Sequence, residues 1–266
     1  MNLKFGFLVH KQPAEKYFEY AGKNGLTHLE IDLFNDHNLL ESFTPKRIRR
    51  LKSLSLKYQI SLSIHPPYLL SFAEKIKMIS MANVKYLKGC IILAKNLDAD
   101  FVTTYLGSIH RQKNFSAARK QALDRAIRNL QEVVKECQKH RVKLALENTY
   151  LMPKDSPIFW LGDNLKDFQK IFSEINSPFL NLCLDLGHAH TNEGILPYLQ
   201  KFGPKIINVH YHDNDGKKDD HQNVGAGAIN WKRVMAAFSD LNYSGPFLSE
   251  TQESPAGSMR KLRKYL

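Results

Sequence analysis

Histidine and carboxylate residues gather between Ile206 and His221, in a stretch that begins as an apolar run and continues as a polar loop. Residues 206–209 have the composition of a buried strand, and His210 stands at its end. Asp219 and His221 lie further along the loop. Imidazole nitrogens and carboxylate oxygens are common ligands of divalent metal ions. The stretch therefore predicts part of a metal site, provided that other strands end in similar residues.

Other predicted strands do end in such residues. In chain order, the strand ends carry His10, Asp32, His65, Tyr105, Glu147, Asp185, His210 and Glu250, and His188, Asp219 and His221 follow close behind. Taken singly, each has an ordinary structural explanation, such as a loop histidine or a carboxylate that caps a helix. The whole set is harder to explain by packing, because buried charged groups are costly unless they are paired or bind a cation.

The elements that must position these residues alternate regularly. Apolar and alternating patterns predict strands over residues 3–9, 27–33, 60–64, 101–105, 142–146, 179–184, 205–209 and 245–249. Helical spacing predicts helices over residues 14–23, 44–58, 74–96, 116–140, 164–175, 195–202, 230–241 and 259–265. This alternation favours an α/β fold, a single (β/α)8 barrel that spans residues 1–266 as one domain. An open doubly wound sheet is the competitor, but no G-x-G-x-x-G follows the first strand.

In such a barrel the active site lies where the strands end. Glu147, Asp185, His210 and Glu250, on four successive strands, would hold a divalent ion such as Mn²⁺, Zn²⁺, Co²⁺, Mg²⁺ or Fe²⁺, because the set has oxygen and nitrogen but no thiolate. A facing pair of metal-bound glutamates can also move a proton to and from a substrate. We expect only one of His210 and His212 to face the barrel axis, with His212 outside it or behind the ligands.

Composition narrows the protein class. The chain has 266 residues, 43% of them hydrophobic and 24% charged, which is ordinary for a globular protein. It lacks both a signal peptide pattern and the ~18-residue apolar run of a membrane span. Three widely spaced cysteines, Cys90, Cys137 and Cys183, favour buried thiols in a reducing cytoplasm.

The formal net charge of +12 is compatible with an anionic partner such as nucleic acid or a phosphorylated small molecule. The densest basic runs, residues 46–52 and 260–264, fall in helix-like segments with apolar spacers. A solvated helix face is therefore the alternative to a nucleic-acid footprint.

Several motifs resemble the xylose isomerase-like TIM-barrel superfamily, which holds sugar-phosphate isomerases and epimerases and also endonuclease IV. They are Glu147-Asn148-Thr149, Leu184 to Ala189, His210 to Gly216, Asp219-Asp220-His221 with Gly225-Ala226-Gly227, and Leu248 to Thr251. The resemblance covers the whole chain and is specific at the level of the superfamily.

Similarity to the epimerase branch implies one divalent ion on Glu147, Asp185, His210 and Glu250. It also implies proton exchange by Glu147 and Glu250, and contact between His188 and substrate oxygens, with His65 a further substrate-binding candidate. The arginine that this branch often places shortly after the seventh strand is replaced by Lys217 and Lys218.

Similarity to endonuclease IV implies a zinc cluster. Its ligands would include a second set, His65, His188, Asp219 and His221, besides the first four residues. Tyr105 stands where that family has a histidine, and tyrosine is a poor zinc ligand at neutral pH because its pKa is about 10.

The leading hypothesis is therefore an enzyme, a metal-dependent isomerase or epimerase of a small sugar, sugar phosphate or similar hydroxycarbonyl compound. The first alternative is an endonuclease IV-like zinc phosphodiesterase that acts on abasic DNA. The second is a catalytically inert barrel that binds a metal or ligand. The long loop over residues 150–163 would be either a lid over the substrate or a segment packed on the barrel rim.

Overall fold

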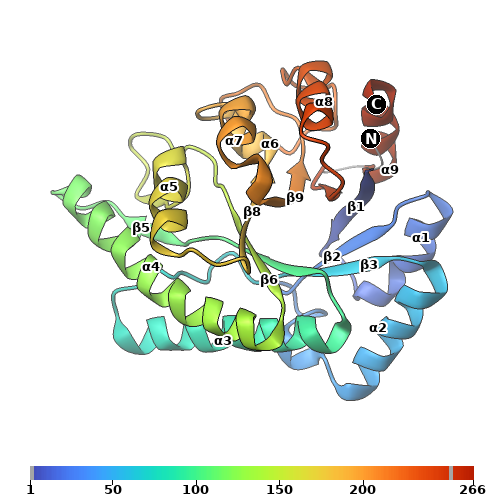
Figure 1. Cartoon of the computed structure of the whole chain (residues 1–266), viewed down its shortest axis with the longest axis horizontal. Coiled ribbons are helices and arrows are strands. Elements are labelled where there is room, and N and C mark those ends of the chain that lie inside the picture. Colours follow the sequence, from blue (N-terminus) through green and yellow to red (C-terminus); the bar gives the residue numbers. More distant parts are fainter. Residues whose placement is uncertain (1–2, 252–253) are drawn as a thin grey trace.

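Eight short apolar segments form parallel strands that close into a barrel in the computed structural model, which describes residues 3–251 and 254–266 (Figure 1). Around the barrel the order is β1-β10-β9-β8-β6-β4-β3-β2. The strands are β1 (Lys4–Val9), β2 (His28–Asp32), β3 (Ser61–His65), β4 (Phe101–Thr104), β6 (Lys143–Glu147), β8 (Leu180–Asp185), β9 (Ile206–Tyr211) and β10 (Pro246–Ser249). The expected (β/α)8 barrel is confirmed.

Helices follow the strands and cover the outside of the barrel (Figure 1). They are α1 (Phe18–Lys23), α2 (Pro45–Tyr58), α3 (Lys77–Leu97), α4 (Phe115–His140), α5 (Leu165–Glu174), α6 (Leu186–His190), α7 (Ile195–Phe202), α8 (Trp231–Asp240) and α9 (Pro255–Leu262). Thr44 caps α2 as its sequence predicts, because its hydroxyl accepts from the Arg47 backbone N–H. None of the described helices is both long and apolar enough to cross a membrane.

Three local predictions differ from the structure. The loop over residues 150–163 is not wholly irregular, because it contains β7 (Ile158–Trp160), which pairs antiparallel with β5 (Ser108–His110). The helix predicted over residues 14–23 is split into a 3-10 turn (Ala14–Lys16) and α1. The closing helix starts earlier than expected, at Pro255, where the Ser254 side chain caps it.

The strand register brings the carboxyl ends of the strands to one rim. Asp32 lies beside His65 across β2 and β3, and Asp185 lies beside His210 across β8 and β9. Apolar side chains fill the space between strands and helices. The barrel interior below the rim is polar instead, with Glu30, Ser63 and Thr103 fully buried.

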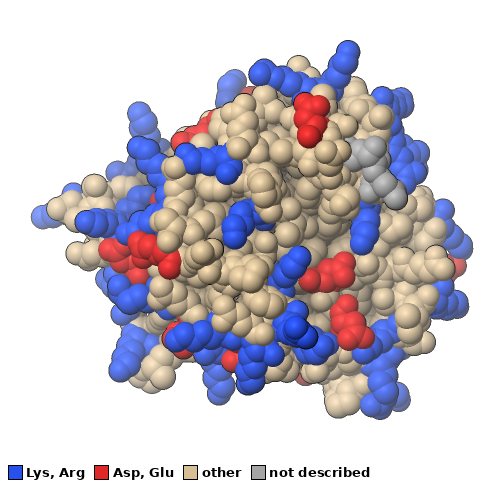
Figure 2. Space-filling model, viewed as in Figure 1, with Lys and Arg blue, Asp and Glu red and all other residues tan. Residues whose placement is uncertain are grey.

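Positive charge is spread over the face of the molecule shown in Figure 2. On the face shown in Figure 2, lysine and arginine side chains are scattered among neutral residues and do not gather into one stripe. On that face, the net charge of +12 thus gives no continuous track for a nucleic-acid backbone.

Closure of the barrel leaves no room for a side chain at Gly6. A Cβ there would collide with the backbone carbonyl of His28 on the neighbouring strand β2. At Gly25, which has φ +67°, a Cβ would meet nothing, so only backbone strain opposes it. We predict that Gly6→Ala lowers the free energy of unfolding by about 3 kcal/mol or more. Gly25→Ala should cost about 1 kcal/mol. Urea unfolding measures both, and equal losses would contradict the packing argument.

Candidate active site

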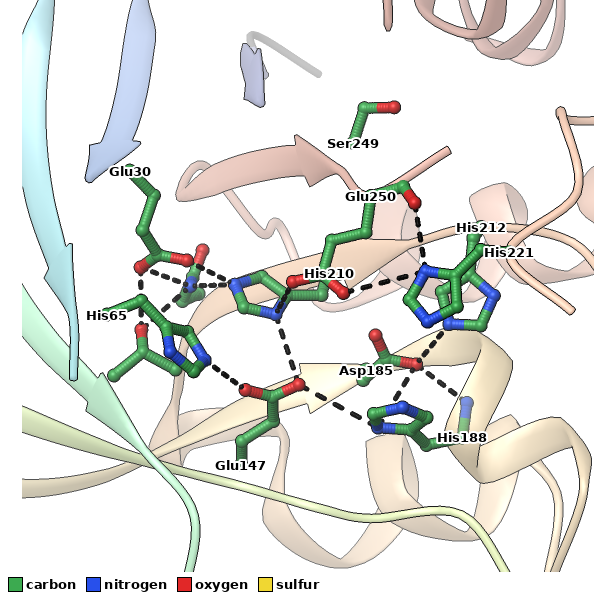
Figure 3. Close-up of polar contacts among 12 residues, drawn as sticks. Glu30, His65, Glu147, Asp185, His188, His210, His212, His221, Ser249 and Glu250 are labelled. Atoms are coloured by element: carbon green, nitrogen blue, oxygen red, sulfur yellow. Dashed lines mark hydrogen bonds and ion pairs between the residues drawn. The ribbon is translucent and has the colours of Figure 1, made fainter. Parts of the chain in front are cut away.

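The rim of the barrel brings the four predicted ligands together (Figure 3). Glu147 ends β6, Asp185 ends β8, His210 lies on β9 and Glu250 follows β10. Each offers one ligand atom, and these atoms all lie within 4.8 Å of one another. The first three side chains are fully buried.

His210 lies between carboxylates. Its Nδ1 is 2.9 Å from Glu250 Oε1 and 3.2 Å from Glu147 Oε1, and its Nε2 is 2.6 Å from Glu30 Oε2. Burial alone would lower the pKa of this imidazole, but the carboxylates around it raise it well above its usual range. Burial would raise the pKa of Glu147, yet His210 and His65 lower it to about 2. The site therefore favours ionised carboxylates, the form that binds a cation.

A second group stands next to the first. His188, His212, Asp219 and His221 also offer ligand atoms within 4.8 Å of one another. Asp219 Oδ2 is 3.2 Å from His221 Nε2 and 3.4 Å from His188 Nε2. Burial opposes the charge on Asp219, but these histidines lower the pKa of its carboxyl group. Three of the residues predicted for a second metal are thus gathered here.

The position of His212 corrects the sequence analysis. Its ring is fully buried, and its Nε2 lies 3.2 Å from Asp185 Oδ1 and 3.3 Å from Asp219 Oδ1. The ring also stacks on His221, with the centroids 4.0 Å apart. Residues separated by one position along an extended segment point to the same face, so His210 and His212 both face the site. The expectation that only one of them would face the axis was wrong.

His65 and Tyr105 both hydrogen-bond to Glu147, so His65, which was expected in the second group, lies with the first. His65 Nε2 lies 3.0 Å from Glu147 Oε2, and the Tyr105 hydroxyl donates to Glu147 Oε1 at 3.2 Å. Burial lowers the pKa of His65, but its hydrogen bond to Glu147 outweighs this and raises it to about 9. Burial raises the pKa of Tyr105 well above its ordinary value, so this side chain stays protonated and acts as a donor.

Glu30 is a buried carboxylate that was not predicted from the sequence, because it lies inside a strand and not at its end. It lies in the middle of β2, where its Oε1 accepts from the Ser63 hydroxyl at 3.0 Å and the Thr103 hydroxyl at 2.8 Å. Its other oxygen contacts His210. The signal was present in the sequence, because residues 28, 30 and 32 alternate with apolar residues and so share one strand face. Glu30 fixes the His210 ring from the side away from Glu147 and Glu250.

Asp213 organises the loop that carries Asp219 and His221. The sequence of residues 213–220, taken apart from a metal site, predicts a solvated acidic turn. Asp213 is fully buried instead. Its carboxylate accepts from the Trp231 indole at 2.7 Å and from the Gly225 backbone N–H at 2.8 Å. This residue therefore ties the loop to the start of α8.

One carboxylate oxygen of the buried Asp185 caps a helix, and the other lacks a hydrogen-bond partner among the described residues. Its Oδ1 accepts from the His188 backbone N–H at 2.6 Å and caps α6, so the helix-cap interpretation of this residue is correct. Its Oδ2 has no hydrogen-bond partner among the described residues, and the same holds for both ring nitrogens of His212 and for Asp219 Oδ1. Buried polar atoms normally find partners. A divalent cation would satisfy this group, and its oxygen and nitrogen donors suit one.

A pocket of about 390 Å³ opens onto these residues. Its polar wall includes His65, His188, Asp219, His221 and Glu250, and its aromatic wall includes Tyr68, Tyr105, Tyr150 and Trp160. Glu147 lies directly behind Tyr105 and His65. Two backbone hydrogen bonds hold the segment over residues 150–163 to the rim: the Leu161 N–H donates to the Gly107 carbonyl, and the Thr149 N–H donates to the Gly162 carbonyl. The pairing of β5 with β7 holds it as well. An open cleft with aromatic walls suits a small polar ligand with apolar faces.

Known proteins resemble the chain over most of its length. The family model described as xylose isomerase-like TIM barrel matches residues 18–266. The uncharacterized protein MJ1311 of Methanocaldococcus jannaschii is 29% identical over 84% of this chain and 76% of its own length. Fructoselysine 3-epimerase of Shigella flexneri is 23% identical over 88% of this chain and 83% of its own length. A probable endonuclease 4 of Nitratidesulfovibrio vulgaris is 27% identical over 74% of both chains.

The fold is also found among solved structures. The crystal structure of a D-tagatose 3-epimerase-like protein superimposes with a TM-score of 0.86 and 26% sequence identity. The match covers 99% of this chain and 97% of the other. The two proteins therefore share the barrel fold over their whole length.

The unsatisfied atoms around His212 yield a prediction. We expect His212→Gln to lower the affinity for Mn²⁺ or Zn²⁺ by about tenfold or more, because the variant removes a buried nitrogen that faces two carboxylates. His190→Gln is the matched control, since His190 contacts Asn214 and belongs to neither ligand group. Isothermal titration calorimetry on metal-stripped protein measures both. Equal affinities for the wild type and His212→Gln would contradict the assignment of His212 as a metal ligand.

Proposed function

Because the chain belongs to the xylose isomerase-like TIM-barrel family, we propose that it is a divalent-metal-dependent isomerase or epimerase of a small sugar or sugar-like hydroxycarbonyl compound. One observation carries the proposal. Glu147 and Glu250 approach the same imidazole nitrogen of His210 from different strands. Glu250 lines a pocket with aromatic sides, and Glu147 lies directly behind Tyr105 and His65 of the same wall. Two carboxylates so placed can remove a proton from a substrate carbon and return it.

The ligand groups support a metal cofactor. Glu147, Asp185, Glu250 and an imidazole would hold the ion, and the unsatisfied atoms of Asp185 and His212 favour a cation at this position. When bound, a divalent ion would polarise the substrate carbonyl and so acidify the neighbouring C–H bond. The similarity to fructoselysine 3-epimerase and to a D-tagatose 3-epimerase-like protein supports a sugar as the substrate class.

The protein side chains have separate tasks in this proposal. Glu250 lines the pocket and takes the proton from the carbon next to the carbonyl. Glu147 returns a proton to that carbon, and it receives this proton from the protonated His65 through their hydrogen bond. Tyr105 and His65 hold Glu147 in position through hydrogen bonds to its two oxygens. His188 lines the pocket and contacts substrate hydroxyl groups. Trp160 and Tyr150 stack on the apolar face of the sugar and exclude water.

Proton exchange tests the proposal without knowledge of the natural substrate. In D₂O with Mn²⁺, the protein should replace the proton at carbon 3 of a ketohexose from a panel, which proton NMR detects. Glu147→Gln and Glu250→Gln should each reduce the exchange rate by about 100-fold or more, because neither amide can transfer the proton. Glu132→Gln, on the exposed face of α4, should retain the wild-type rate.

Endonuclease activity is the second candidate, and the group around His188, Asp219 and His221 favours it, since it could hold a further ion. Tyr105 weighs against it, because this residue hydrogen-bonds to Glu147 and stays protonated. Incubation of the Zn²⁺-loaded protein with a duplex that contains one abasic site separates the candidates. We expect no nicking. Nicking that Glu147→Gln abolishes, together with no proton exchange on any ketose, would overturn the isomerase proposal.

A further inference from the structure

A second and larger cavity adjoins the candidate active site. It measures about 960 Å³ and lies between the loop after β1 and the end of β10. Leu8, His221 and Glu250 line both this cavity and the smaller pocket. The two strands are hydrogen-bonded neighbours, with Phe7 opposite Ser249. The two spaces therefore meet at these three residues. A ligand bound at Glu250 can extend from the smaller pocket into the larger cavity.

The size of the added space exceeds what a simple sugar needs. Pockets for drug-sized ligands measure roughly 300–1,000 Å³. The smaller pocket alone, at about 390 Å³, lies within that range. The larger cavity leaves room for a substituent at the far end of the sugar.

The wall of the larger cavity is positively charged. Lys11 and Lys16, from the loop after β1 and the 3-10 turn that follows, line it, and Glu250 is the one carboxylate among its described lining residues, which exclude 252 and 253. Neither lysine forms an ion pair with any of the described residues. Glu15 lies between them in the sequence but faces away, because it pairs with Arg47 at 2.8 Å. The positive charge therefore remains available to a ligand.

Aromatic rings form the floor beneath these lysines. Phe7 meets the edges of Tyr17 and Tyr20, each at 5.7 Å between ring centroids, and all three residues line the cavity. The cavity thus offers an apolar surface on one side and ammonium groups at its edge. Such a surface suits a carbon chain or ring that ends in an anionic group.

We propose that this cavity is a subsite for an anionic group, a phosphate or a carboxylate, at the end of the substrate remote from the reacting carbons. The proposal rests on the proposed function and specifies its substrate class as anionic sugars. Lysine ammonium groups bind such oxygens as flexible point charges, without the planar fork of arginine. Glu250, shared by both spaces, lies between the reacting carbons and the anionic end.

Three ketoses that differ only at carbon 6 test the subsite by calorimetry with the Mn²⁺-loaded protein. They are D-fructose, D-fructose 6-phosphate and D-fructuronate, which carry a hydroxymethyl, a phosphate and a carboxylate group there. We expect one or both anionic sugars to bind about tenfold or more tightly than fructose. The double variant Lys11→Ala/Lys16→Ala should lose that preference and bind fructose as the wild type does. Which anion binds more tightly identifies the natural group.

The matched control is Lys4→Ala/Lys143→Ala. It removes two exposed charges at the first residues of β1 and β6, the ends of these strands that lie away from the rim. It should keep the preference. Equal binding of charged and neutral ketoses by the wild type, or an equal loss in both double variants, would overturn the subsite. Deuterium exchange in the same ketoses separates this result from the proposed function. Exchange without anion preference rejects the subsite alone, and anion preference without exchange rejects the isomerase alone.

Discussion

Burial of several carboxylates at one end of a closed barrel is the constraint on which the rest of the structure depends. Glu30, Glu147 and Asp185 have no exposed surface, so water does not stabilise their charge. Imidazoles lie beside each of them, and the lowered pKa of Glu147, about 2, reflects this arrangement. Well-packed apolar residues in place of buried charges are often at least as stable, so this much buried charge favours a chemical role over a purely structural one.

Each surrounding element serves to hold that cluster in place. The register of β8 and β9 sets Asp185 beside His210, and the hydroxyl groups of Ser63 and Thr103 fix Glu30 beneath it. Asp213 ties the loop after β9 to α8 and so delivers Asp219 and His221 to the rim. The rim is therefore assembled by hydrogen bonds to buried carboxylates as much as by apolar packing.

The sequence predicted the barrel because each strand and helix carries its own pattern of apolar residues, and it predicted the rim because Glu147, Asp185 and Glu250 stand at strand ends. It did not reveal Glu30, which lies inside a strand and gains its role from His210 on the far side of the barrel. The strands β5 and β7 are three residues long, too short for a periodic signal, and exist because they pair with each other. The expectation for His212 was wrong because residues two positions apart on an extended strand share one face, so His212 points to the same side as His210.

Anomalous X-ray diffraction from crystals grown with Mn²⁺ would test the central claim most directly. We expect one strong peak within bonding distance of the carboxylates of Glu147, Asp185 and Glu250 and of an imidazole, His210 or His212. The smaller pocket should remain open beside it for the substrate. Absence of any peak at this rim, or a peak only on surface carboxylates, would contradict the assignment of a metal-dependent active site.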